Sequence, residues 1–141
     1  MSILVDNIPE IPSRLVRQQR ARIFTASALG FARNWIQSWN SHDLSRIGAH
    51  YSHDVVFSSP FIQKLGICNR GMIEGRAELM EYFAMALRRF PDLKFQLRQV
   101  LYGNDAITLV YNSVAGLVAA ETMLLDHQES IRQVWAQYDR V

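Results

Sequence analysis

A single cysteine, Cys68, is present among the 141 residues, so no intramolecular disulfide can form and nothing indicates an oxidising compartment. No apolar run approaches the length of a membrane span. Residues 1–12 carry acidic residues and prolines where a signal peptide has a basic flank and an apolar run. The formal net charge of +2 is too small to indicate nucleic-acid binding. These absences predict a cytoplasmic protein that binds neither nucleic acid nor a membrane.

The remaining composition is that of an ordinary globular domain. Hydrophobic residues make up 49% and charged residues 20%, and 141 residues are enough to bury one substantial core. We expect residues 1–12 to form an N-terminal tail and residues 13–141 to form a single domain. Four arginines crowd residues 14–22, which predicts a solvated helix face or, alternatively, a contact with an acidic partner.

Apolar residues at three- and four-residue spacing predict a long first helix. Pro12 disfavours helix before it, and Ser13 is a suitable N-cap for a helix that begins at the next residue. A break or bend is expected near Gly30. The apolar stripe consists of Phe24, Ala28, Phe31 or Ala32, Trp35 and Trp39.

Two further helices are predicted by their caps and stripes. Asp43 or Ser41 caps a short helix, whose inner face is formed by Leu44, Ile47 and Tyr51. Gly75 precedes another helix, which Pro91 terminates. The inner side of that helix is formed by Leu79, Phe83, Leu87 and Phe90.

The other segments are typical of strands. Residues 55–59 are rich in β-branched and aromatic side chains and stop at Pro60, and residues 61–73 predict a loop or irregular hairpin. Three turns then join four strands into a long antiparallel meander over residues 93–102, 107–115, 118–125 and 131–138. Helices on one face of an antiparallel sheet define an α+β fold.

This element order, with the residues at its joints, resembles the nuclear-transport-factor-2-like superfamily and, within it, the SnoaL-like domains. The resemblance covers roughly residues 28–138. Its segments are Trp39-Asn40-Ser41-His42-Asp43, Tyr51-Ser52-His53-Asp54-Val55-Val56-Phe57, Ile73-Glu74-Gly75-Arg76, Tyr82-Phe83, Phe90-Pro91-Asp92-Leu93-Lys94-Phe95 and Glu121-Thr122-Met123-Leu124-Leu125-Asp126. The resemblance implies a cystatin-like α+β barrel, in which a curved antiparallel sheet wraps around the helices as a cone with an apolar cavity. It also implies a homodimer formed through the outer face of the sheet.

Glu121 is the most informative candidate for chemistry. It lies between Ala119-Ala120 and Met123-Leu124-Leu125, in a strand with no cation nearby. Burial would raise its pKa and allow it to exchange a proton near neutral pH. The alternative is a glutamate paired with Tyr111, His53 or an arginine, which would support the cavity wall without chemistry.

The resemblance also bears on the catalytic residues of ketosteroid isomerases, which belong to the same superfamily. Glu121 looks like their protonated, hydrogen-bond-donating aspartate. Ser59 stands where they have the general-base aspartate, and Trp35 where they have the tyrosine that polarises the steroid oxygen. An unactivated hydroxyl does not replace a carboxylate base, and an indole N–H donates but is no acid. We therefore expect no true ketosteroid isomerase mechanism, although Tyr111, Tyr82 or Tyr138 would offer another donor.

The resemblance, together with the alternation of side chains along the strands, predicts which side chains face the interior. We expect Glu121 and Tyr111 to be the catalytic pair. The expected ligand-binding residues are Trp35, Trp39, Phe57, Ser59, Tyr82, Met123, Val134 and Tyr138. The aromatic residues among them, and Trp135, are also expected to serve as core packing.

Other residues with reactive side chains have structural interpretations. Cys68 is expected to be an inert thiol, because no helix start, histidine or basic residue is seen to lower its pKa. His42 and His127 are expected in solvated turns, and Asp54 in the loop that enters the first strand. His50 and His53 are three residues apart but have no further ligand, so we expect no metal site and no cofactor.

The sequence is compatible with three functions. The first is a SnoaL-like enzyme of isomerase, cyclase or dehydratase type, which acts on a hydrophobic polyketide- or steroid-like molecule by proton transfer. The second is a non-catalytic ligand-binding or dimeric scaffold protein of the same fold. The third is an interaction module that uses the outer sheet face and residues 14–22.

Overall fold

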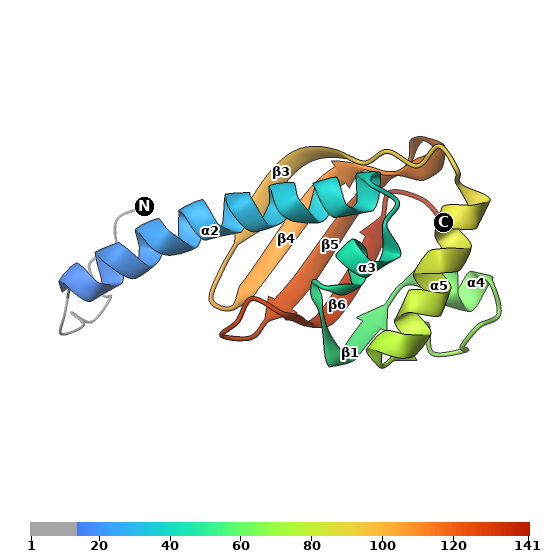
Figure 1. The fold of residues 1–141 in the computed structure, drawn as a ribbon, viewed down its shortest axis with the longest axis horizontal. Coiled ribbons are helices and arrows are strands. Elements are labelled where there is room, and N and C mark those ends of the chain that lie inside the picture. Colours follow the sequence, from blue (N-terminus) through green and yellow to red (C-terminus); the bar gives the residue numbers. More distant parts are fainter. Residues whose placement is uncertain (1–13) are drawn as a thin grey trace.

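A computed structural model describes the backbone of residues 14–141 and the side chains of residues 27–141 (Figure 1). The helices are α2 (Arg14–Asn40), α3 (Leu44–Gly48), α4 (Pro60–Lys64) and α5 (Arg76–Arg89). The strands are β1 (Tyr51–Ser58), β2 (Met72–Glu74), β3 (Gln96–Tyr102), β4 (Ala106–Asn112), β5 (Val118–Leu125) and β6 (Ile131–Tyr138). A short 3₁₀ turn, Val114–Gly116, joins β4 to β5. No helix in this part of the chain is long and apolar enough to span a membrane.

The strands form one six-stranded sheet in the order β2-β1-β6-β5-β4-β3. The four C-terminal strands pair antiparallel with their sequence neighbours, which confirms the predicted meander. β1 joins the free side of β6 in parallel, and β2 pairs antiparallel with β1. The register between β1 and β6 shifts between Tyr51 and Val56, and both Tyr51 and Val55 are buried.

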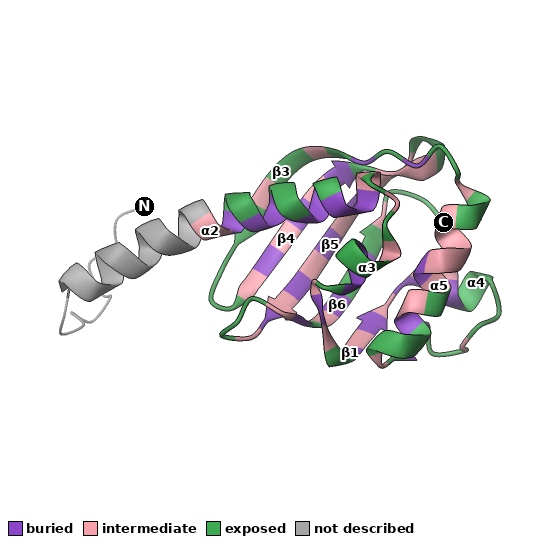
Figure 2. Ribbon diagram, viewed as in Figure 1, coloured by how far each residue is buried: buried purple, intermediate pink, exposed green. Residues whose placement is uncertain are grey.

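The helices lie on one face of the curved sheet, with α2 crossing it and α5 near its β1 end (Figure 1). The buried side of α2 faces the sheet and its exposed side faces solvent (Figure 2). Side chains of β5 alternate between buried and half-buried along the whole strand. The Ser27 hydroxyl of α2 donates a hydrogen bond to the Glu129 carboxylate in the β5–β6 turn, which attaches the helix to the sheet. The predicted α+β fold is therefore confirmed.

The structure differs from the sequence prediction in several local details. The first helix is continuous through Gly30, which is exposed with open space around its Cα. Residues 61–73 include most of α4 and part of β2, and because β2 pairs antiparallel with β1 the irregular hairpin is confirmed, with a short helix inside it. The predicted cap Ser13 and the side chains of the arginines in 14–22 lie outside the described residues. Asp43 caps α3 as predicted, because its carboxylate accepts a hydrogen bond of 3.0 Å from the Ser45 amide.

Candidate functional site

Glu121 lies in the middle of β5 and points into the space between the sheet and the helices. It pairs with Leu109 of β4 and Ala136 of β6, and only 5% of its surface is exposed. Its neighbours on the same face of β5, Ala119 and Met123, are completely buried. Alternation along β5 therefore places one carboxyl group in an otherwise apolar row.

The two oxygens of the Glu121 carboxyl group have different surroundings. The Tyr111 hydroxyl donates a 2.6 Å hydrogen bond to Oε1. Oε2 is buried and has no hydrogen-bond partner among the described residues. Burial raises the pKa of Glu121 from 4.5 to about 7, and the hydrogen bond from Tyr111 partly opposes this. The carboxyl group is therefore divided between its acid and carboxylate forms at neutral pH.

An aromatic cluster surrounds the Tyr111 side of this carboxyl group. The ring of Trp35 in α2 lies 5.3 Å from that of Tyr111 and stacks on Phe95 at 5.9 Å. Phe95 in turn lies 4.7 Å from Tyr111, measured between ring centroids. Because these rings fix the position of Tyr111, they also fix the direction of the bond that it donates to Glu121.

Tyr51 also belongs to this cluster, and the expectation that it lies on the inner face of a helix is wrong. It is the first residue of β1 and is almost completely buried. Its hydroxyl accepts a 3.1 Å hydrogen bond from the Trp35 indole N–H. The Trp39 indole N–H lies close enough to lower the pKa of Tyr51 but has no hydrogen bond of proper geometry among the described residues. Burial first and the Glu121 charge second raise that pKa well above its ordinary value.

Ser59 lies directly after β1, at the place where the resemblance has a catalytic base. It is 2% exposed and its hydroxyl accepts a 3.3 Å hydrogen bond from the Phe61 amide, as the N-cap of α4. Burial raises the pKa of both Tyr82 and Tyr138, and the neighbouring Ser59 hydroxyl partly offsets this. Ser59 therefore caps α4 and lies beside Tyr82 and Tyr138, and its expected part in ligand binding stays a prediction.

The other predicted ligand-binding residues also converge on the interior. Trp39, Phe57, Met123 and Val134 are all buried. Trp39 and Phe57 both contact Phe83 of α5, with ring centroids 4.6 and 5.4 Å apart. These aromatic contacts join α2, β1 and α5 on the inner side of the sheet.

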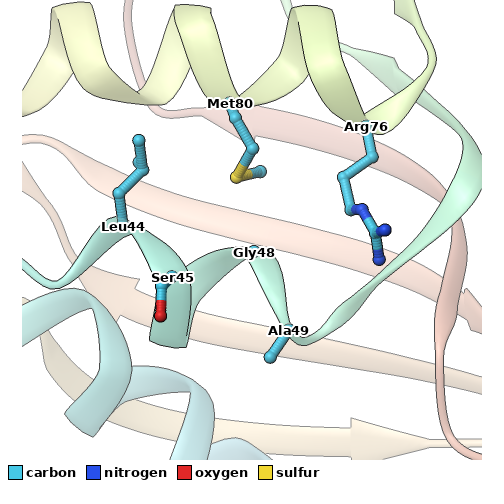
Figure 3. Close-up of a pocket in the computed structure, with 6 residues that line it drawn as sticks. All are labelled: Leu44, Ser45, Gly48, Ala49, Arg76 and Met80. Atoms are coloured by element: carbon cyan, nitrogen blue, oxygen red, sulfur yellow. The ribbon is translucent and has the colours of Figure 1, made fainter.

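Two hollows on the molecule lie elsewhere. One of about 520 Å³ lies between α3 and α5 (Figure 3), and one of about 410 Å³ lies on the outer sheet face beside Ser58, Thr122 and Trp135. Glu121 lines neither of them. The predicted apolar cavity at Glu121 therefore stays a prediction.

Three expectations for individual side chains are wrong. Trp135, expected in the core, is 42% exposed on the outer sheet face. His42, expected in solvent, is half-buried, and its Nε2 donates a 2.7 Å hydrogen bond to the Leu93 carbonyl. Asp54, expected in the loop that enters the first strand, lies within β1. Hydrogen bonds from the Met72 and Arg70 backbone lower the pKa of Cys68, which depends on loop geometry, and its expected role as an inert thiol stays a prediction.

The two histidines considered as metal ligands have different surroundings. The Ser38 hydroxyl donates to the Asn34 carbonyl at 2.9 Å, so the bond between Ser38 and His50 Nε2, also 2.9 Å, has the histidine as donor. Burial, and after it the charge of Arg46, lowers the pKa of His50. His53 is exposed on β1. Within residues 27–141 no three histidine, cysteine or acidic side chains converge in a possible metal site.

Comparisons with known proteins agree with this architecture. The family model for the SnoaL-like domain matches residues 32–138. A comparison with curated protein sequences found no match. A SnoaL-like protein of unknown function from Burkholderia thailandensis E264 has 33% sequence identity. The match covers 80% of this chain and 94% of that protein, with a TM-score of 0.78.

More distant structures share the fold alone. A proposed ketosteroid isomerase from Kribbella flavida DSM 17836 has 16% identity and a TM-score of 0.62, over 79% of this chain and 77% of that one. A protein of unknown function with a cystatin-like fold from Methylobium petroleophilum PM1 has 16% identity and a TM-score of 0.65, over 82% and 78% of the two chains. The match of the family model over most of the sequence, together with the Burkholderia structure, decides the family: the chain belongs to the SnoaL-like proteins.

Proposed function

We propose that this protein binds a hydrophobic polyketide- or steroid-like molecule between its sheet and helices and transfers a proton through Glu121. The supporting observation is the unpartnered Oε2 of a buried carboxyl group whose pKa lies near 7. A buried polar atom without a partner costs free energy, which a ligand that forms the missing hydrogen bond would recover. The ligand class comes from the resemblance and from the apolar row around Glu121.

The chemistry rests on the two forms of the carboxyl group. The acid form would donate its proton from Oε2 to a ligand carbonyl oxygen, while Tyr111 holds Oε1. The carboxylate form would accept a proton from a carbon next to such a carbonyl. Isomerisation, cyclisation and dehydration each need one of these transfers.

A second candidate function is binding without turnover. It is favoured by Ser59, whose hydroxyl oxygen caps α4 at the place where the isomerases have their base. In this case Glu121 would supply one hydrogen bond to a bound ligand and no proton would be exchanged.

The first test is a carboxyl-carbon NMR titration of Glu121, with Glu121→Gln to assign its signal. Glu81→Gln is the matched control, because Glu81 is exposed in the middle of α5. We expect a midpoint near 7 for Glu121. A midpoint near that of a free glutamate, ~4.3, would mean that the carboxyl group is solvated or paired with a charge. It would contradict the role of Glu121 in both candidate functions.

The second test separates the two candidates. The protein is incubated in deuterated water with steroid-like and polyketide-like enones, and deuterium uptake next to the carbonyl is measured by mass spectrometry. Uptake that Glu121→Gln abolishes and Glu81→Gln preserves would support the enzyme. Ligand binding without uptake would support the binding protein and contradict the enzyme.

We also propose that the protein is a cytoplasmic homodimer formed through the outer face of its sheet. Trp135 is 42% exposed there, and together with Thr122 and Gln137 it lines a hollow on this face. Light scattering of the wild type should give twice the mass of the chain. Trp135→Lys should give the monomer mass, and a monomeric wild type would contradict the proposal.

A further inference from the structure

A groove crosses the helical layer between α3 and α5, away from Glu121. Its volume of about 520 Å³ falls within the range of ~300–1,000 Å³ typical of small-molecule sites. The groove is lined by Leu44, Ser45, Gly48, Ala49, Arg76 and Met80 (Figure 3). Leu44 and Ser45 lie at one end and Arg76 with Ala49 at the other, and Met80 and Gly48 lie between them (Figure 3).

The close approach of the two helices forms the apolar floor of the groove. A Cβ atom on Gly48 would lie 2.8 Å from the Met80 sulfur, so a side chain there would force Met80 aside. Met80 is half-buried and packs against the hydrophobic core. Together with Leu44 it offers a flexible apolar surface, which suits a flat hydrocarbon group.

Arg76 gives the groove its charge. It is the only charged residue in the lining, and its Nη1 donates a 3.2 Å hydrogen bond to the Tyr51 carbonyl. This bond orients the guanidinium group and occupies only one of its N–H donors. Among residues 27–141 no carboxylate forms a salt bridge with Arg76.

The other charges near the groove leave its Arg76 end positive. α5 begins at Arg76, and Gly75 provides no side-chain cap, so the positive end of the helix dipole lies at the same end of the groove. Glu78 lies two residues further, about 200° around the helix, and so on its opposite side. Asp43 lies beyond the other end of the groove, where its carboxylate accepts hydrogen bonds from the Ser45 and Arg46 amides.

We propose that this groove binds a small apolar carboxylic acid as its anion. The carboxylate pairs with the guanidinium group of Arg76, and the hydrocarbon part lies on Met80 and Leu44. Guanidinium–carboxylate pairs combine charge with two parallel hydrogen bonds, which gives the site its preference for a carboxylate. The site is separate from Glu121 and does not depend on the function proposed there.

The test is an NMR titration of the backbone amides with 1-naphthoate, and with 1-naphthalenemethanol as the neutral analogue of the same shape. We expect 1-naphthoate to shift the amide signals of Gly48 and Ala49 and to bind more tightly than the alcohol. Arg76→Gln removes the charge and the paired donors of the guanidinium group and should weaken the binding of 1-naphthoate by about tenfold or more. Arg88→Gln changes an exposed arginine of the same helix and should leave binding unchanged.

Two further variants locate the ligand. Ala49→Phe places a ring in the exposed Arg76 end of the groove and should prevent binding, whereas Glu121→Gln should not affect it. Equal binding of the alcohol, or unchanged binding by Arg76→Gln, would overturn the proposal. So would signal shifts confined to the neighbours of Glu121, or the absence of binding at millimolar 1-naphthoate.

Discussion

Replacement of Glu121 by glutamine should change how the stability of the protein depends on pH. The folded-state pKa of Glu121 is about 7 and its ordinary value is 4.5. The folded protein therefore binds more protons than the unfolded chain between these pH values, and its stability falls as the pH rises through them. Well below pH 4.5 the acid form is present in both states, and ionisation of Glu121 then has no effect on stability.

The magnitude is set by the difference between the two values. They differ by about 2.5, and each pKa unit corresponds to about 1.36 kcal/mol, so the wild type loses about 3 kcal/mol above pH 7. Glutamine keeps an oxygen that can accept the Tyr111 hydrogen bond but does not ionise. The Glu121→Gln variant should therefore lack this loss.

Urea unfolding of both proteins at pH 4.5 and pH 8.5 measures the effect. The decrease in unfolding free energy between the two pH values should be about 3 kcal/mol larger for the wild type than for Glu121→Gln. The comparison between variants cancels the contributions of all other titrating groups. Glu81→Gln should retain the wild-type dependence. Equal pH dependence in the wild type and Glu121→Gln would refute the argument, because it would mean that Glu121 is solvated or paired with a cation.

Substitutions at three other positions test contacts at the site and in the helical layer. Tyr111→Phe removes the hydrogen bond that opposes the effect of burial on Glu121, so its NMR titration midpoint should rise further. Asp43→Ala removes the cap that accepts from the Ser45 amide and should cost about 1 kcal/mol in urea unfolding, whereas Asp43→Ser should restore most of it. Phe83→Ala should cost about 3–5 kcal/mol, because the ring is 3% exposed in the aromatic cluster. A loss below about 1 kcal/mol for Phe83→Ala would mean that the space beneath α5 is already open to solvent.

Local rules of the chain were enough to predict the inward side of the C-terminal strands. Successive side chains alternate between the two faces of a strand, so Tyr111, Glu121 and Val134 could be assigned to the interior once the resemblance had oriented the meander. The same holds for Asp43, whose side chain reaches the amide of Ser45 only two residues away. These features depend on nearest neighbours in sequence.

Contacts between distant segments could not be derived in this way. The bond from Trp35 to Tyr51 joins a helix and a strand, and depends on the place that β1 takes beside β6. His42 reaches the Leu93 carbonyl across 51 residues, so its turn position gave no sign of this contact.

The order of amino acids was sufficient to predict that one carboxyl group would lie in an apolar row of a strand, because strand periodicity and composition are properties of adjacent residues. The packing of the folded chain was needed to show that Tyr111 occupies one oxygen of Glu121 while the other stays without a partner. It was needed also to show that Arg76 and Met80 face α3 across a groove. Both outcomes depend on strand order and helix packing, which are fixed by the summed contacts of the whole core and not by any one segment.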